Sequence, residues 1–203
     1  FTPTAGLNHH VVYVDLASLY PNLMRALNVG PDTIIGTEED LAESEYTEDD
    51  CVWGYIDPRP VKHVRKGEDW RVHAHDQFKM VYETDTPTVK WVDDPRYERC
   101  YYLHPDVREG FIAEGTQRLL DMKHEYSGDL YEAIKRIVNS QYGYMGYATE
   151  NNSSRLYDWR IAESITLAGR KVIKETADFV RRYLWQECGV HAEDTYVALG
   201  DTD

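Results

Sequence analysis

Cysteine is scarce in this sequence, and its three cysteines, Cys51, Cys100 and Cys188, stand far apart with no CxxC pair. They give no sign of a disulfide framework or of a thiolate zinc site. Long apolar runs are also absent, so no segment is predicted to cross a bilayer, and the sequence shows no signal peptide. From these absences we expect a cytoplasmic protein with reduced thiols and no membrane partner.

Positive charge is in short supply as well, because 22 Lys and Arg residues stand against 36 Asp and Glu, which gives a net charge of -14. Such a charge opposes nonspecific attraction to polyanions. Affinity for phosphate depends on where Lys and Arg gather, so nucleic-acid binding stays open. An acidic surface also fits a salt-rich cytoplasm, where screening weakens repulsion between like charges. A halophilic source is therefore a hypothesis to test.

The patterning that is present changes along the chain. The acidic run at residues 37–50 predicts a solvated linker or a surface helix, and segments of period two between residues 51 and 103 predict short antiparallel strands. From residue 105 the helical spacing predicts a hairpin of two helices, then a long helix from about Asp158 to Trp185 that ends at Gly189. The apolar stripe expected on the first hairpin helix comprises Phe111, Gly115, Leu119 and Tyr126, with Ile112 and Leu120.

Two apolar segments that end in acids lie at opposite ends of the chain. The run Val11–Val14 is a predicted strand that ends at Asp15, and a second predicted strand ends at Asp201 and Asp203. Adjacent in an α+β fold, these strands would gather three carboxylates, whose mutual repulsion divalent cations such as Mg²⁺ remove. Two such ions about 3.5–4 Å apart stabilise the attacking and leaving oxygens of an in-line phosphoryl displacement. For any one of these acids alone, a turn residue at a strand end is the simpler interpretation.

A second polar cluster is predicted on the second hairpin helix. Lys135, Asn139 and Tyr142 follow at i, i+4 and i+7 and so share one helix face. A solvated face with an incidental Tyr would give the same pattern. The functional alternative is a surface that receives a nucleotide, with a lysine against the triphosphate, an aromatic ring beneath a base, and Gly143 leaving room for a bulky group.

These stretches resemble motifs of the family B (Pol α-like) DNA polymerases. "DLASLYP", from Asp15, resembles the first palm motif, D-x-x-S-L-Y-P, and "KRIVNSQYG", residues 135–143, matches the fingers motif K-x-x-x-N-S-x-Y-G. "GDTD", residues 200–203, resembles the second palm motif, and "RIAESITLAGR", residues 160–170, resembles the helix that joins the last two motifs. All stand in family order, and the resemblance covers most of residues 11–33 and 110–203.

The resemblance implies a role for each matching position. Three acids would serve the two catalytic Mg²⁺ ions: Asp15, Asp203 and, less directly, Asp201. The residues implied to meet the incoming nucleotide are Leu16, Ser18, Leu19, Tyr20, Lys123, Lys135 and Asn139. Among these, Tyr20 would be the steric gate that excludes a ribose 2′-hydroxyl, while Tyr142 and Gly143 would lie under the nascent base pair.

The chain also departs from the family pattern. Lys123 stands where the family usually has an Arg that faces the phosphates, and Ser127 stands where it usually has a Lys. A lysine keeps the charge and loses the bidentate fork, so the grip on phosphate would be weaker. Leu199 replaces the usual Tyr before "GDTD", which leaves the acids in place.

The fold class implied is α+β: a palm with an antiparallel sheet and a packed helix, a helical-hairpin fingers subdomain and a small β-rich insertion. Residues 1–36 would be the first part of the palm, 37–104 the acidic linker and insertion, 105–150 the fingers and 151–203 the second part of the palm. The resemblance implies an archaeal source. The chain has no initiator Met and stops at a motif where family B inteins are found, so we expect a fragment that is inactive by itself.

The activity that the resemblance implies is DNA-directed DNA polymerisation in replication or repair, with dNTPs and primer-template DNA as substrates. Expected partners are the thumb, exonuclease and N-terminal domains, or a split or intein partner, with a sliding clamp as a further candidate. Two alternatives stay open. A two-metal nuclease would also use clustered acids but has no need of the Lys135, Asn139 and Tyr142 face. A catalytically silent polymerase-like scaffold would have no physical reason to keep all three acids and the fingers lysine, and the end of the chain at Asp203 is the one feature in its favour.

Overall fold

The structure, a computed structural model, describes residue 6 and residues 10–57, 78–82, 89–93, 97–149 and 152–191, with 78–82 and 89–93 described by their backbone alone. The predicted metal ligands Asp201 and Asp203, and the predicted strand before them, lie outside the described residues. The chain divides into two compact units, residues 15–56 with 98–169, and residues 1–14 with 57–97 and 170–203. The mixture of helices and antiparallel sheet confirms the predicted α+β class.

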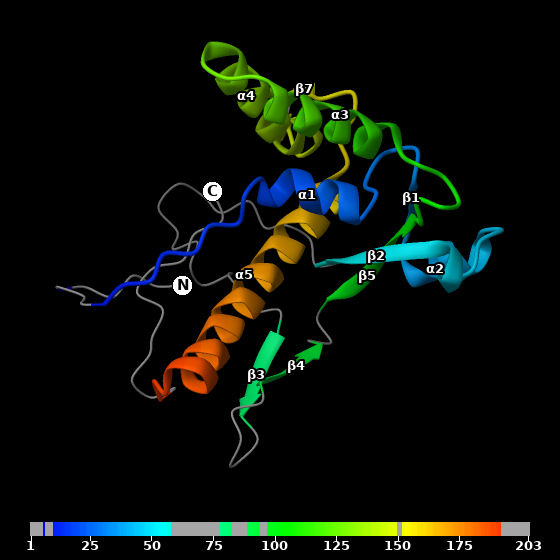
Figure 1. Cartoon of the computed structure of the whole chain (residues 1–203). Helices are drawn as coiled ribbons and strands as arrows, with labels where there is room; N and C mark the ends of the chain where they lie inside the picture. Colours follow the sequence, from blue (N-terminus) through cyan, green and yellow to red (C-terminus); the bar gives the residue numbers. More distant parts are fainter. Residues whose placement is uncertain are drawn as a thin grey trace. The chain divides into compact units, whose positions relative to one another are not determined.

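The first unit is built on a three-stranded antiparallel sheet in the order β1–β5–β2 (Figure 1). The strands are β1 (Ile34–Gly36), β2 (Cys51–Ile56) and β5 (Glu98–Leu103), and β2 pairs with β5 along its whole length. Cys100 and Tyr102 of the central strand β5 belong to the main core, while the buried Tyr101 and Leu103 alternate with them on the opposite face. Both faces of β5 are therefore covered.

The acidic run forms short, capped helices. α2 (Glu38–Glu43) and the 3₁₀ helix η1 (Glu48–Asp50) each begin with a capping box, in which Thr37 pairs with Asp40 and Thr47 with Asp50. The reciprocal bonds satisfy backbone N–H groups that a helix start leaves unpaired. α2 contacts β1 and β5, so this run lies against the sheet.

The predicted helical hairpin is present as α3 (Phe111–Glu125) and α4 (Asp129–Met145). It lies against α1 (Leu19–Ala26), and the first part of α5 (Trp159–Cys188) passes on the other side of α1 (Figure 1). A small cluster of Leu120, Ile134 and Val138 holds the hairpin together. The main core joins α1, both hairpin helices, α5 and the sheet through fully or nearly buried side chains: Met24, Val29, Ile56, Cys100, Tyr102, Ile112, Met145, Ile161 and Ile165.

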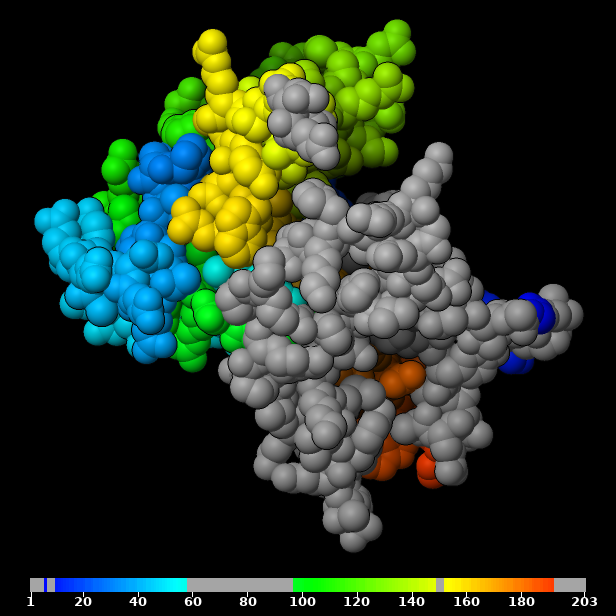
Figure 2. All heavy atoms as spheres, turned by 180° about the vertical axis from the view of Figure 1, so that it is seen from behind, coloured from blue at the N-terminus to red at the C-terminus, as the bar shows by residue number. Residues whose placement is uncertain are grey.

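The long helix α5 ends where the sequence predicts. Gly189 follows it with a φ of 69°, its N–H donates to the carbonyl of Trp185, and the N–H of Val190 donates to the carbonyl of Leu184. A glycine adopts this left-handed conformation at a helix end without steric strain. Between α4 and α5 lies a small antiparallel hairpin of two strands with two residues each, β6 (Ala148–Thr149) and β7 (Asn152–Ser153). The yellow segment that leads into α5 is exposed on the face shown in Figure 2.

In the second unit, β3 (Phe78–Tyr82) pairs antiparallel with β4 (Val89–Asp93). Both strands were predicted from period-two segments of the sequence. No helix in the described part of the chain is long and apolar enough to cross a membrane.

One local prediction is wrong and another is correct only in part. Residues 11–14 form no strand, and the side chains of Val11, Val12, Tyr13 and Val14 are 49–85% exposed, because no described strand pairs with this segment. The stripe predicted for α3 is correct at Ile112 and Leu120, which are buried together with Ala113 and Thr116, and wrong at Phe111 and at Tyr126, the C-cap, which are exposed. Thr116 belongs to the buried face because its hydroxyl is paired with the carbonyl of Ile112 and with Gln141 on α4.

Candidate functional site

The turn before α1 has an unusual backbone at Ser18, which adopts the left-handed region with φ 52° and ψ 45°. Its side chain makes no capping bond to the helix. The first N–H groups of a helix have no partner within the helix, and here the serine hydroxyl does not supply one. The turn is fixed instead by Asn22, whose side-chain amide donates to the carbonyl of Ala17 at 3.0 Å.

The Ser18 hydroxyl is engaged by a cation from the helical hairpin. Lys123, near the end of α3, donates from Nζ to Ser18 Oγ at 2.9 Å. The same ammonium lies 5.6 Å from the ring centroid of Tyr131 on α4, within the range of a cation–π contact. One positive charge is therefore held where the turn before α1 meets both hairpin helices.

A second contact joins the same two parts of the chain. The rings of Tyr20 on α1 and Tyr142 on α4 lie with centroids 4.8 Å apart and a tilt of 57°. Burial raises the pKa of the Tyr142 phenol above its usual value, and the neighbouring Tyr20 adds to the effect. Both rings are partly buried and pack against the main core, which limits their movement.

The remaining predicted residues of α4 face outward. Lys135 and Asn139 are exposed, and neither has a described side-chain partner. A Cβ built on Gly143 would meet no atom within 4 Å, so the space above this glycine is open. The predicted face of Lys135, Asn139 and Tyr142 thus exists on α4, with Tyr142 as its point of contact with α1.

Of the three predicted metal ligands, the structure describes Asp15 alone. Its side chain is exposed at the end of the extended segment, directly before the turn that carries Ser18. Among the residues with described positions, no group of three or more His, Cys, Asp or Glu side chains could hold a metal ion. The predicted grouping of Asp15 with Asp201 and Asp203 stays a prediction. Leu16 and Leu19, also predicted here, are partly buried on either side of this turn.

Buried Asn28, which the sequence reasoning missed, connects α1 to the start of the hairpin. Its amide nitrogen donates to the carbonyls of Leu103 and Arg108, both at 2.8 Å, and its oxygen accepts from the N–H of Gly110 at 2.9 Å. Asn28 has a φ of 49°, a conformation in which asparagine is enriched. The one available signal was an asparagine at the position after the C-cap of α1, where a left-handed residue is common.

The hairpin start has a further fixed point. Gly110, the N-cap of α3, has no side chain to satisfy the helix, and Asp32 Oδ2 accepts from the N–H of Phe111 at 3.2 Å instead. A carboxylate at a helix N-terminus is favourable both as a hydrogen-bond acceptor and toward the helix dipole. Asn28 and Asp32 together fix where α3 begins relative to α1.

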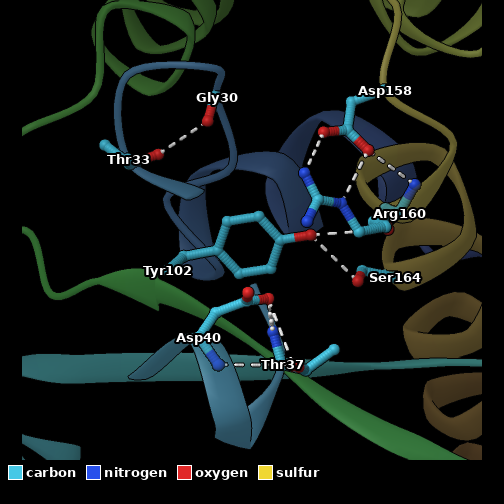
Figure 3. Close-up of polar contacts among 8 residues, drawn as sticks. All are labelled: Gly30, Thr33, Thr37, Asp40, Tyr102, Asp158, Arg160 and Ser164. Atoms are coloured by element: carbon cyan, nitrogen blue, oxygen red, sulfur yellow. Dashed lines mark hydrogen bonds and ion pairs between the residues drawn. The ribbon is translucent and has the colours of Figure 1, made fainter. Parts of the chain in front are cut away.

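A third set of contacts holds the beginning of α5 (Figure 3). The hydroxyl of Tyr102 on β5 lies 3.0 Å from Ser164 Oγ and donates to the carbonyl of Arg160 at 3.4 Å. Arg160 forms a two-pronged pair with Asp158, with N–O distances of 3.1 and 2.7 Å. Burial raises the pKa of the Tyr102 phenol well above its usual value, so this hydroxyl keeps its proton. The sheet therefore fixes the rotation of α5.

The chain is similar in sequence to known DNA polymerases. The family model for DNA polymerase family B matches residues 1–203. DNA polymerase 2 of Aeropyrum pernix is 30% identical over 172 residues, which are 85% of this chain and 17% of that protein. The DNA-directed DNA polymerase of Enterobacteria phage T4 is 27% identical over 238 residues, 100% of this chain and 25% of that protein. The DNA polymerase of Archaeoglobus fulgidus is 29% identical over 175 residues, 86% of this chain and 17% of that protein. The chain thus spans between 17% and 25% of the length of these relatives.

Proposed function

The chain belongs to DNA polymerase family B, and from this premise we propose that it forms the nucleotide-binding part of a DNA-directed DNA polymerase acting in replication or repair. In the proposed reaction the primer 3′-hydroxyl gives up its proton to water, and its oxygen forms a bond to the α-phosphorus of a dNTP. The bond from that phosphorus to the bridging oxygen breaks, and pyrophosphate leaves. Primer-template DNA and dNTPs would be the substrates.

The observation that carries this proposal is the pair of contacts between α1 and the hairpin. Lys123 lies 2.9 Å from Ser18 Oγ, and Tyr20 lies against Tyr142. Three residues implied to bind the nucleotide and one implied to lie under the base pair meet in two contacts between the segment at α1 and the hairpin, and the partners in each contact are more than a hundred positions apart in the chain. Their juxtaposition supports the roles that the motifs imply.

Charge explains what this arrangement does to a triphosphate. Lys123 is fixed at the turn before α1, and Lys135 is exposed one helix away with no described side-chain partner. A phosphate oxygen arriving at the turn would replace the neutral Ser18 hydroxyl as the hydrogen-bond acceptor of Lys123. The new hydrogen bond would be stronger, because its acceptor is charged. The first N–H groups of α1 face the same turn and favour an anion.

Metal ions complete the proposed site. Asp15 fits the role of a ligand, because its carboxylate is exposed, has no described side-chain partner and lies directly before the Ser18 turn. We propose that Asp15, with Asp203 and less directly Asp201, holds two Mg²⁺ ions, which prefer carboxylate and phosphate oxygens. When bound, such ions offset the charge that builds up on the transferred phosphoryl group.

Sugar selection falls to Tyr20 in this proposal. Its ring is held by Tyr142 and by the core beneath it, so it cannot swing away freely when a nucleotide enters. A rigid ring beside the sugar would collide with a 2′-hydroxyl and accept deoxyribose. Asn139 would meet the triphosphate, and Tyr142 with Gly143 would lie under the new base pair.

Other parts of a polymerase are proposed as partners. The relatives are four to six times longer than this chain, so the thumb, exonuclease and N-terminal domains would be supplied beyond the matched region. A split or intein partner and a sliding clamp stay further candidates. We also propose that the 203 residues alone do not extend a primer.

Primer extension tests the proposal on the complete polypeptide that carries these residues, with Mg²⁺ and all four dNTPs. Asp15→Asn should abolish extension, and Lys135→Ala should raise the KM for dNTP by about tenfold or more, because a lost hydrogen bond to a charged group costs about 1.5–3 kcal/mol. Arg136→Ala is the matched control, since Arg136 is exposed on α4 one position from the predicted face. Equal effects of the two substitutions would contradict the assigned face.

The alternatives predict different products. A two-metal nuclease would shorten single-stranded DNA with Mg²⁺ and no dNTP, in an Asp15-dependent reaction. A silent scaffold would neither extend nor shorten any strand. Either result would replace the polymerase proposal.

A further inference from the structure

The Tyr20 ring rests directly on the backbone of α5. At Gly169, a Cβ built on the backbone would lie 2.9 Å from Tyr20 Cε1 and 3.6 Å from both Tyr20 Cδ1 and Leu23 Cδ1. A separation of 2.9 Å is closer than real Cβ contacts, so any side chain at this position would force the ring to move. Gly169 is itself buried. The ring therefore occupies the space that a side chain at position 169 would need.

Tyr20 is thus bounded by two helices. The ring of Tyr142 on α4 lies at 4.8 Å, and α5 lies beneath at Gly169. The depth at which the ring rests depends on how closely α5 approaches α1. With any residue other than glycine at 169, the ring would have to rest farther from α5.

The rotation of α5 that presents Gly169 is fixed by contacts already described. Ser164 is paired with Tyr102 on the sheet, and Ile161 and Ile165 are fully buried in the core. A Cβ built on Gly54 of β2 would come 2.9 Å from Ser164 Cβ, so the helix also lies tight against the sheet there. Gly169 follows Ser164 by about one and a half helical turns, which places it on a different side of α5. The sheet contact on one side thereby holds Gly169 against Tyr20 on another.

We propose that Gly169 is a specificity-determining positioning residue. It sets the depth of the Tyr20 ring and so the room left for the 2′ position of the incoming sugar. This inference rests on the proposed function, in which Tyr20 selects deoxyribose. Gly169 would not touch the nucleotide, and it would act through the ring alone.

The test is a double-substitution cycle in the complete polypeptide that carries these residues. Gly169→Ala should push the ring outward and narrow the sugar site. The kcat/KM for dNTP should fall, and the kcat/KM for rNTP should fall further, so that selectivity for deoxyribose rises by about tenfold, the discrimination that one methylene gives in a pocket. The loss should lie mainly in KM. In a Tyr20→Ala background the same substitution should leave selectivity unchanged, whereas in Tyr20→Phe, which keeps the ring, the effect should persist.

Gly115→Ala is the matched control, because it adds the same methyl group to a helix where a Cβ meets nothing within 4 Å. It should leave selectivity unchanged. A Gly169→Ala effect of equal size for both sugars, or one that persists without the Tyr20 ring, would assign Gly169 a purely structural role and overturn the inference. If Tyr20→Ala does not relax selectivity, the assignment of the gate fails, and this inference fails with it.

Two measurements need no catalysis. Binding of dATP and ATP to a complex with a primer that lacks its 3′-hydroxyl should show the same change in selectivity, and an unchanged ratio overturns the inference. Binding of neither nucleotide overturns the proposed function. If Gly169→Ala lowers the melting temperature, Tyr20→Ala should restore it by removing the collision, and failure to restore it would show that the ring is not what the methyl group meets.

Discussion

At the scale of single residues, Asn28 illustrates how one amide holds three backbone groups. Asn28→Ala would leave the carbonyl of Leu103 and the N–H of Gly110 buried without this partner, and would also remove the part-buried bond to the carbonyl of Arg108. Leaving a buried polar group unpaired costs about 1–3 kcal/mol, so the free energy of unfolding should fall by about 2–4 kcal/mol. Urea denaturation measures this loss.

The chain provides a control for that substitution on the same helix. The side chain of Asn22 makes two exposed hydrogen bonds: its amide nitrogen donates to the carbonyl of Ala17, and its oxygen accepts from Arg25. Asn22→Ala should lower the free energy of unfolding by about 0.5 kcal/mol, as expected of an exposed position. Similar losses at Asn22 and Asn28 would show that the buried network does not stabilise the fold.

The three cysteines should differ in reactivity. Burial raises the pKa of the Cys100 thiol to about 11, whereas Cys188 is exposed at the end of α5. At pH 8, a thiol reagent should label Cys188 first, Cys51 slowly and Cys100 only after unfolding, because the thiolate is the reactive form. Labelling of Cys100 at the rate of Cys188 in the folded protein would contradict its burial.

The raised pKa of the Cys100 thiol also makes the free energy of unfolding depend on pH. Cys100 has a higher pKa folded than unfolded, where the thiol has its ordinary value of 9.0. The folded form therefore binds the proton more tightly, and this contribution to stability is complete below pH 9 and is lost as the pH rises toward 11. Cys100→Ser should make the decline over that range shallower in urea titrations.

At the scale of helices and strands, the bond between Tyr102 and Ser164 links β5 to α5. Tyr102→Phe and Ser164→Ala should each lower the free energy of unfolding by about 1 kcal/mol, the net value of one hydrogen bond. The double variant should lose less than the sum of the two, because both substitutions remove one interaction. Strict additivity in urea denaturation would show that the two hydroxyls do not interact.

Helices were easier to predict from the sequence than the sheet. The hairpin and α5 follow from a sustained 3.6-residue spacing and from glycines at helix ends, which are local signals. Period two identified β2, β3 and β4 as strands without naming their partners. β2 and β5 pair across a long intervening segment, and pairing of that kind depends on tertiary packing that periodicity does not encode.

The buried face of α3 shows the same limit. Its stripe was predicted from apolar residues, yet Thr116 is fully buried and Phe111 is exposed. A threonine can be buried because its hydroxyl is satisfied within the helix and by Gln141. At the candidate site, the resemblance named Ser18, Tyr20, Lys123 and Tyr142 one by one. It did not indicate that Ser18 meets Lys123 and Tyr20 meets Tyr142, or that Gly169 and Asn28 support them.

At the scale of the whole molecule, the net charge of -14 predicts a response to salt. Repulsion among surface carboxylates opposes the compact state, and screening shortens its range from about 10 Å at 0.1 M salt to about 3 Å at 1 M. The urea midpoint should therefore rise between dilute and molar KCl, with sucrose of equal osmolality as the control. A flat or falling curve would remove the hypothesis of a halophilic source.

The contact between Lys123 and Ser18 also has a kinetic consequence. The Lys123 ammonium is hydrogen-bonded to the Ser18 hydroxyl before any substrate binds. An entering phosphate therefore has to displace that hydroxyl. Ser18→Ala would remove this internal hydrogen bond. Stopped-flow measurements should then show faster nucleotide association, because the Lys123 ammonium no longer has to break a bond to the protein before it binds phosphate.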